Sequence, residues 1–184
     1  MIRIALVGDI GSGKSYIAKN FGFPVFDADY EVSKLYKTDK KVFVKIKKAL
    51  PEYFYSFPLS KTEITNAILA EKKNLKKIVK VVHLEIRKKM NFFLKKNKDK
   101  KIVILDIPLY LENKLNKKED IIIFVQSKKT DIEKKLKKRK NFNKNIYRKF
   151  KEIQLSLDNK KKKSHFIIKN DFTKKTVKKS IFKI

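Results

Sequence analysis

Three of the four glycines in the sequence lie in one stretch, VGDIGSGKSY, at residues 7–16. This stretch matches G-x-x-x-x-G-K-[ST], the pattern of a loop that binds phosphate through its backbone N–H groups, at Gly8, Gly13, Lys14 and Ser15. In such a loop the lysine contacts the outer phosphates of a nucleotide, and the hydroxyl binds Mg²⁺. An apolar run, IRIALV, precedes the stretch and a helical apolar pattern follows it, as the motif requires. The sequence therefore predicts a phosphate-binding loop.

Acidic residues follow two further apolar runs, at the points where strands would end. Asp27 and Asp29 follow FPVF, and Asp106 ends KIVILD. Parallel sheets bind ligands at the carboxyl ends of their strands, so we expect these carboxylates near the phosphates. Phosphoryl transfer needs a carboxylate that orients the attacking hydroxyl and accepts its proton. Asp27 and Asp29 fit this role, although helix capping also explains them, and Asp106 fits either metal binding or acceptor binding.

The elements that must position these residues are indicated by the apolar pattern of the whole chain. Strands are predicted at residues 2–7, 24–26, 101–106 and 121–125, with a weaker one in 164–170. Helices are predicted from Ala28 and over residues 39–50, 61–70, 72–96, 128–140, 143–157 and 172–182, with a break at 141–143. Ser60 is the predicted N-cap of the helix that begins at residue 61.

Apolar strands separated by helices indicate an α/β fold with a parallel sheet that is covered on both faces. We expect a single three-layer P-loop domain over residues 1–184 with a five-stranded parallel sheet. Its core would span about 1–30 and 100–184, a helical acceptor-binding insertion about 31–99, and a lid about 136–155.

The composition is strongly basic, with 49 lysines and arginines, 19 acidic residues and a formal net charge of +30. The lysines are dispersed along most of the chain, which favours a compositional bias over a nucleic-acid-binding stripe, so we expect no specific nucleic-acid partner. There is no cysteine, which excludes disulfides, and no apolar run long enough to span a membrane. We expect a cytoplasmic monomer that binds small molecules.

Only four of the basic residues are arginines: Arg3, Arg87, Arg139 and Arg148. The planar guanidinium group binds phosphate through two hydrogen bonds, and lysine replaces it poorly. An arginine in a chain so rich in lysine is therefore a candidate phosphate ligand. Arg3, at the start of the chain, is expected to be incidental.

Several segments together resemble the bacterial dephospho-CoA kinases. They are GDIGSGKS, FPVFDADY, VVHLEIRKKM, ILDIPLYLEN, IIIFV and IQLSLDNKKKKSHFIIKN, and they cover essentially the whole chain in the family's order. The family pattern includes H-P-x-I-R on a long helix, D-I-P-L-L-F-E at a strand end, and Q-x-x-x-x-x-K before a final strand and asparagine. The resemblance implies a P-loop kinase that uses ATP and Mg²⁺ to phosphorylate the ribose 3′-hydroxyl of dephospho-CoA, which completes coenzyme A.

The resemblance also implies roles for individual residues. The ATP phosphates would be held by Gly11, Ser12, Gly13, Lys14, Ser15 and Tyr16, with Lys14 also catalytic. Asp29 corresponds to the catalytic base or acceptor anchor, with Asp27 beside it. His83 and Arg87 correspond to the motif on the substrate side, where the guanidinium would meet phosphates of dephospho-CoA. Arg139 corresponds to an arginine at the start of the lid, which would close over ATP and stabilise the transferred group.

Some positions depart from the family pattern, and other functions stay open. Asp9 replaces the second glycine of the phosphate loop, and its carboxylate would weaken ATP binding unless it points outward. One alternative is another small-molecule P-loop kinase, which would phosphorylate a nucleoside or nucleotide. A second alternative is a basic nucleic-acid-binding protein with ATP as a switch, which would bind nucleic acid tightly at physiological salt.

Overall fold

The computed structural model describes residues 1–140 and 142–183, and the chain divides into two compact units. The sheet unit comprises residues 1–28, 93–142 and 154–184, and the helical unit comprises residues 29–92 and 143–153. The predicted helix break begins at position 141, which lies outside the described residues. The chain leaves the helical unit for the last time between residues 153 and 154.

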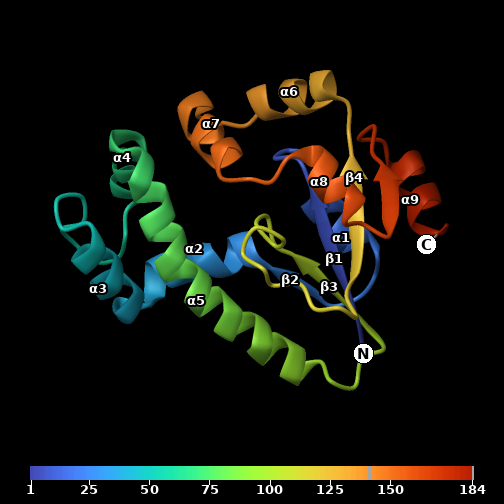
Figure 1. Cartoon of the computed structure of the whole chain (residues 1–184), viewed down its shortest axis with the longest axis horizontal. Coiled ribbons are helices and arrows are strands. Elements are labelled where there is room, and N and C mark those ends of the chain that lie inside the picture. The colour runs from blue at the N-terminus through green and yellow to red at the C-terminus, as the bar shows by residue number, and fades with distance from the viewer. Residues whose placement is uncertain (141, 184) are drawn as a thin grey trace. The chain divides into compact units, whose positions relative to one another are not determined.

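Parallel strands form the core of the sheet unit (Figure 1). They are β1 (Ile2–Gly8), β2 (Val25–Asp27), β3 (Ile102–Asp106), β4 (Ile121–Gln126) and β5 (Phe166–Lys169), in the spatial order β2-β3-β1-β4-β5. Uninterrupted apolar runs form the central strands because both faces of a parallel sheet are covered, and residues 4–8 of β1 are all buried. Because β1 is the middle strand, its carboxyl end at Gly8 lies at the centre of the edge that is formed by the carboxyl ends of the strands.

The helices of the sheet unit are α1 (Lys14–Asn20), α6 (Lys129–Lys137), α8 (Leu157–Lys162) and α9 (Lys174–Ile181). α1, α8 and α9 contact the strands, whereas side chains of α6 lie beside Gly11 of the phosphate loop. Side chains of α1 and α9 join those of the strands in a buried apolar cluster that contains Ile4, Leu6, Ile17, Ala18, Ile104, Ile123, Val125, Ile168 and Val177. α8 contacts β1. The predicted α/β fold with a five-stranded parallel sheet is therefore confirmed.

Residues 143–157, which are predicted as one helix, form parts of two. α7 (Lys144–Glu152) lies in the helical unit, and α8 begins at Leu157 in the sheet unit. The hydroxyl of Ser156 accepts a hydrogen bond of 3.2 Å from the N–H of Asn159, which caps α8 as a separate helix. The prediction of a single helix is wrong because the apolar pattern gives no sign of the N-cap at Ser156.

The helical unit contains most of α2 (Ala28–Thr38) and α5 (Lys72–Lys96), together with α3 (Lys40–Ala49), α4 (Lys61–Ala70) and α7. The hydroxyl of Ser60 accepts a hydrogen bond from Glu63 N–H, and a carboxylate oxygen of Glu63 accepts one from Ser60 N–H. The predicted N-cap at Ser60 is thus confirmed as a capping box. Among the described residues, none of the helices combines the length and the apolar character needed to cross a membrane.

At the amino ends of the strands, Arg3 of β1 forms a nearly buried ion pair with Asp120, which immediately precedes β4. The hydroxyl of Tyr110 donates a second hydrogen bond to the same carboxylate. The expectation that Arg3 is incidental is wrong. This ion pair lies at the sheet edge opposite to the carboxyl ends of the strands.

Candidate active site

The phosphate loop, residues 8–15, joins the central strand β1 to α1. Gly8 has a φ of +150°, and a Cβ there would lie 2.6 Å from the carbonyl oxygen of Val125. Gly13 has a φ of +89°, and a Cβ there would lie 2.4 Å from Nδ2 of Asn170. Both positions therefore require glycine, the first because of a close approach and the second because of its backbone conformation as well.

The amino end of α1 has the electrostatic character of an anion site. Gly13 is its N-cap residue, and within the described part of the chain no side chain caps this helix and its first turn holds no acidic residue. The first N–H groups of a helix have no partners within the helix, and the helix dipole makes this end partially positive. An anion at this end of α1 is therefore stabilised.

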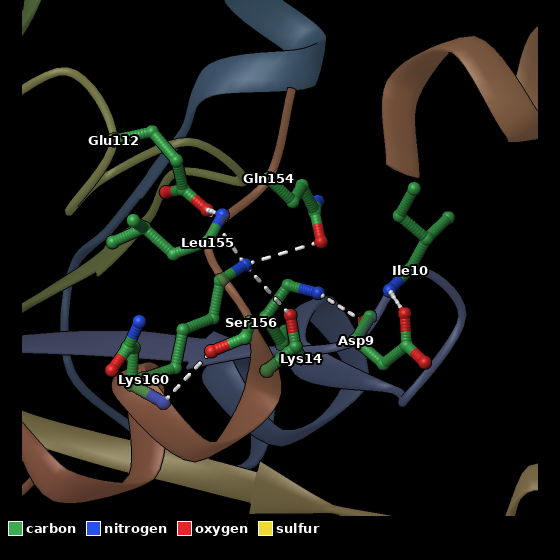
Figure 2. A network of polar contacts seen from close by, with 10 residues as sticks. Asp9, Ile10, Lys14, Glu112, Gln154, Leu155, Ser156 and Lys160 are labelled. Carbon is green, nitrogen blue, oxygen red and sulfur yellow. Dashed lines mark hydrogen bonds and ion pairs between the residues drawn. The ribbon is translucent and has the colours of Figure 1, made fainter. Parts of the chain in front are cut away.

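Lys14 and Asp9 hold the phosphate loop through internal hydrogen bonds. Lys14 is only 8% exposed, and its Nζ donates a hydrogen bond of 2.7 Å to the carbonyl oxygen of Asp9. A carboxylate oxygen of Asp9 accepts a hydrogen bond of 2.6 Å from the N–H of Ile10 (Figure 2). The carboxylate of Asp9 thus binds a backbone amide of the loop itself.

The carbonyl oxygen of Ser12 is held from the ends of two strands. Asn170, directly after β5 and 3% exposed, donates from Nδ2 over 2.8 Å, and Ser127, directly after β4, donates from its hydroxyl over 3.0 Å. Asn170 also accepts a hydrogen bond from Phe172 N–H through its Oδ1. Asn170 is the asparagine that follows the final strand in the family pattern, but no role is predicted for it or for Ser127. The available signal is their position one residue after a strand, because such residues share the ligand edge of the sheet.

Four of the predicted site residues meet where β2 and β3 end. Asp27 and Asp106 are directly paired residues of these neighbouring strands, and the hydroxyl of Ser15 donates a hydrogen bond to Asp106. Burial raises the pKa of Asp106, which is 4% exposed; the Ser15 hydrogen bond and the charge of Lys14 lower that pKa, and the charge of Asp27 raises it. Two carboxylates, a hydroxyl and an ammonium group are therefore grouped beside the phosphate loop.

Asp29, His83 and Arg87 belong to the helical unit. Asp29 is exposed in the first turn of α2, where the helix dipole favours a negative charge. His83 and the exposed Arg87 lie one turn apart on α5. Nε2 of His83 is buried and has no hydrogen-bond partner within residues 1–140 and 142–183. Burial and, to a lesser extent, the charge of Arg87 lower the pKa of His83, so its ring is neutral at pH 7.

The two arginines predicted for the lid fall in different units. Arg139 is exposed in the sheet unit just after α6, and its N–H donates a hydrogen bond of 3.0 Å to the carbonyl oxygen of Leu136. Arg148 is exposed on α7 in the helical unit, where it lines a surface hollow with Leu69, Asn145, Lys149 and Glu152. Tyr16 is exposed in the first turn of α1.

A parallel sheet whose central strand leads into a G-x-x-x-x-G-K-S loop, with carboxylates at the ends of neighbouring strands, defines a P-loop kinase. The family model of the dephospho-CoA kinases matches residues 2–176. A dephospho-CoA kinase of Wolbachia pipientis is 35% identical over 179 residues, which cover 95% of this chain and 91% of that protein. A dephospho-CoA kinase of Rickettsia typhi is 32% identical over 187 residues, which cover 100% of this chain and 96% of that protein. The chain belongs to the dephospho-CoA kinase family.

Solved structures show the same fold. A Thermus thermophilus protein has a TM-score of 0.79 at 20% identity, and the alignment covers 99% of this chain and 94% of that one. A dephospho-CoA kinase from Campylobacter jejuni has a TM-score of 0.61 at 19% identity, with 98% and 94% covered. At these identities the likeness concerns the arrangement of strands and helices.

Proposed function

We propose that this protein transfers the γ-phosphate of ATP to the ribose 3′-hydroxyl of dephospho-CoA, the last step of coenzyme A biosynthesis. The observation that carries the proposal is the extent of the family match, which runs over residues 2–176 and so includes the whole helical unit. A phosphate loop alone is shared by kinases with many acceptors, whereas a match through the helical unit supports this particular acceptor. Another small-molecule P-loop kinase is therefore not favoured.

In this proposal residues 11–16 bind the phosphates of ATP. The uncapped amino end of α1 supplies N–H groups and a partial positive charge, and Lys14 supplies a full positive charge. Asn170 and Ser127 fix the carbonyl oxygen of Ser12 and thereby the shape of the loop. A loop whose shape is fixed before the nucleotide binds loses less conformational entropy on binding.

Ser15 and Asp106 would hold Mg²⁺. The fit rests on the donor set, because a hydroxyl already bonded to a buried carboxylate, with a second carboxylate paired beside it, offers the oxygen ligands that Mg²⁺ prefers. When bound, the ion neutralises charge on the phosphates. Asp106 meanwhile orients the Ser15 hydroxyl through their hydrogen bond.

Asp29 is the proposed proton acceptor or anchor for the 3′-hydroxyl, with Asp27 beside it. Its exposed position in the first turn of α2 keeps it accessible to a substrate. Asp27 and Asp29 are two residues apart, on either side of the point where the chain passes from the sheet unit to the helical unit. A carboxylate at this point can orient an acceptor hydroxyl for attack and take up its proton.

His83 and Arg87 are the proposed ligands of the acceptor. The exposed guanidinium of Arg87 suits a phosphate of dephospho-CoA, and the neutral His83 ring has a buried Nε2 without a partner among the described residues. Arg139 would act from a lid at about 136–155, and residues of about 31–99 would form the acceptor-binding insertion. Arg148, in the same lid segment, is a further candidate for contact with ATP.

The test is a panel of acceptors incubated with γ-labelled ATP and Mg²⁺. We expect label on dephospho-CoA, at a position that a 3′-nucleotidase releases, and little or none on nucleosides and nucleoside monophosphates. Transfer to a nucleoside monophosphate but not to dephospho-CoA would overturn the proposal and favour the alternative kinase.

A further inference from the structure

Lys160, on α8, is a fully buried lysine with a defined set of partners. It is 1% exposed, and its Nζ forms an ion pair of 2.9 Å with a carboxylate oxygen of Glu112. The same ammonium group donates a hydrogen bond of 3.1 Å to the side-chain oxygen of Gln154 and makes a longer contact of 3.4 Å to the carbonyl oxygen of Gly8. Figure 2 shows the side chains of Glu112 and Gln154 directed toward the ammonium group.

The partners of Lys160 come from three separate segments of the sheet unit. Gly8 ends β1 and begins the phosphate loop, Glu112 lies in the segment between β3 and β4, and Gln154 lies between α7 and α8. An ammonium group has three donors, so one lysine can bind all three acceptors at once. The arrangement therefore links three segments through a single side chain.

Glu112 makes a second link to the segment that follows α7. The carboxylate oxygen paired with Lys160 also accepts a hydrogen bond of 3.0 Å from the N–H of Leu155. Residues 154 and 155 are the first residues of the sheet unit after the chain leaves the helical unit. Lys160 and Glu112 thus fix residues 154 and 155 within the sheet unit.

A buried charge is costly unless it is paired, and a buried ion pair is often no more stable than an apolar replacement of both partners. Stability alone is therefore a weak reason for a lysine at this place. Its contact with the first carbonyl group of the phosphate loop suggests a different role, because the position of that group determines where the loop begins.

We propose that Lys160 is a positioning residue for phosphoryl transfer, which with Glu112 holds the start of the phosphate loop and residues 154–155 of the sheet unit in one fixed arrangement. The inference rests on the proposed function, since it assumes that the loop binds ATP. Lys160 acts through Gly8, Gln154 and Glu112 and does not itself touch the nucleotide.

The experiment compares Lys160→Met, Glu112→Gln and the double variant, with Arg3→Met as a matched control. Methionine fills the volume of lysine without donors, and glutamine keeps an acceptor for Leu155 N–H. Lys160→Met alone leaves a buried carboxylate without its cation and lowers the thermal midpoint, and the double variant recovers most of that loss. Arg3→Met breaks another nearly buried ion pair, at the opposite edge of the same sheet.

The decisive measurements are the KM for ATP, the KM for dephospho-CoA and the ATP affinity of the folded protein by titration calorimetry. We expect Lys160→Met and the double variant to weaken ATP binding roughly tenfold, as for a lost hydrogen bond from a charged group, and to leave the KM for dephospho-CoA unchanged. Arg3→Met lowers the thermal midpoint and leaves both KM values unchanged. Gln154→Leu, which keeps the ion pair, weakens ATP binding less and lowers the thermal midpoint less than Lys160→Met.

Recovery of ATP affinity together with stability in the double variant would overturn the proposal, because Lys160 would then only neutralise Glu112. An equal loss of ATP affinity in Arg3→Met would also overturn it, as general destabilisation would explain the effect. If Lys160→Met does not fold, an unchanged ATP affinity in Gln154→Leu contradicts the proposal. Wild-type protein that binds ATP but does not phosphorylate dephospho-CoA would refute the proposed function, and calorimetry would still decide the role of Lys160.

Discussion

Replacement of Gly13 by alanine tests whether the phosphate loop is closely fitted to the end of β5. The new Cβ would lie 2.4 Å from Nδ2 of Asn170, at a residue with a φ of +89°. The left-handed conformation costs a residue with a Cβ about 1–2 kcal/mol. Displacing Asn170 from the carbonyl oxygen of Ser12 costs about 1–3 kcal/mol more, because the buried side-chain amide and the carbonyl group lose each other as hydrogen-bond partners. We expect Gly13→Ala to lower the free energy of unfolding by roughly 3 kcal/mol.

Gly22→Ala is the matched control for this substitution. Gly22 has a φ of +74°, and no described atom lies within 4 Å of the Cβ position. Its replacement should therefore cost only the conformational part, about 1–2 kcal/mol. Urea denaturation measures both losses, and titration calorimetry measures ATP affinity, which we expect to fall sharply for Gly13→Ala and to stay unchanged for Gly22→Ala.

The Asn170→Ala background separates the steric part of the cost from the conformational part. Without the Asn170 side chain the Cβ at position 13 meets no amide nitrogen, so the penalty of Gly13→Ala should fall to that of Gly22→Ala. Equal penalties for the two glycine substitutions in the otherwise unchanged protein would refute this reasoning. A Gly13→Ala penalty that is undiminished in the Asn170→Ala background would refute it as well.

The other predictions concern charged residues of the site. Lys14→Ala should abolish turnover in the acceptor assay, because it removes the charge that stabilises the phosphates; measurable turnover would exclude Lys14 from that role. Asp29→Asn should leave the ATP affinity measured by calorimetry unchanged and lower kcat by roughly 10²- to 10⁴-fold. A near-normal kcat would exclude Asp29 as the base. Asp9→Gly should lower the KM for ATP roughly fivefold, since about 1 kcal/mol of repulsion is relieved, and an unchanged KM would mean that the carboxylate points away from the phosphates. Asp106→Asn should lower turnover and raise the thermal midpoint. Because burial raises the pKa of Asp106 above 3.8, the unfolded chain ionises first as pH rises, so the wild-type protein loses stability from about pH 3.8 upward. The gain in midpoint should thus be small near pH 4 and larger at pH 7, and a gain independent of pH would contradict this assignment.

The sheet and the long helix α5 were predictable because their signals are local. Uninterrupted apolar runs are typical of strands buried on both faces, and the predicted helix over residues 72–96 has the observed bounds of α5. The positions of Asp27 and Asp106 at the ends of two strands of one parallel sheet were also predicted from the apolar pattern. Their direct pairing was not, because it depends on β2 lying next to β3, and the strand order leaves no local signal.

The contacts that depend on distant residues were not predictable. Lys160 is the lysine of the family pattern Q-x-x-x-x-x-K that begins at Gln154, but the pattern does not show that this lysine is buried while Lys161, Lys162 and Lys163 are exposed. The burial of Lys160 requires Glu112, which lies 48 residues earlier in the chain, in a different segment. The ion pair of Arg3 with Asp120 was not predictable for the same reason. Ion pairs between remote segments leave no periodic signal.

The support of Ser12 by Asn170 has a consequence for biosynthesis. The side-chain amide that braces the loop at Ser12 comes from Asn170, 158 residues later along the chain. A growing chain should therefore acquire its full nucleotide affinity only after β5 and Asn170 have left the ribosome, so ATP cannot help earlier intermediates to fold. Stalled ribosomal complexes that end before and after β5 would differ in nucleotide binding accordingly.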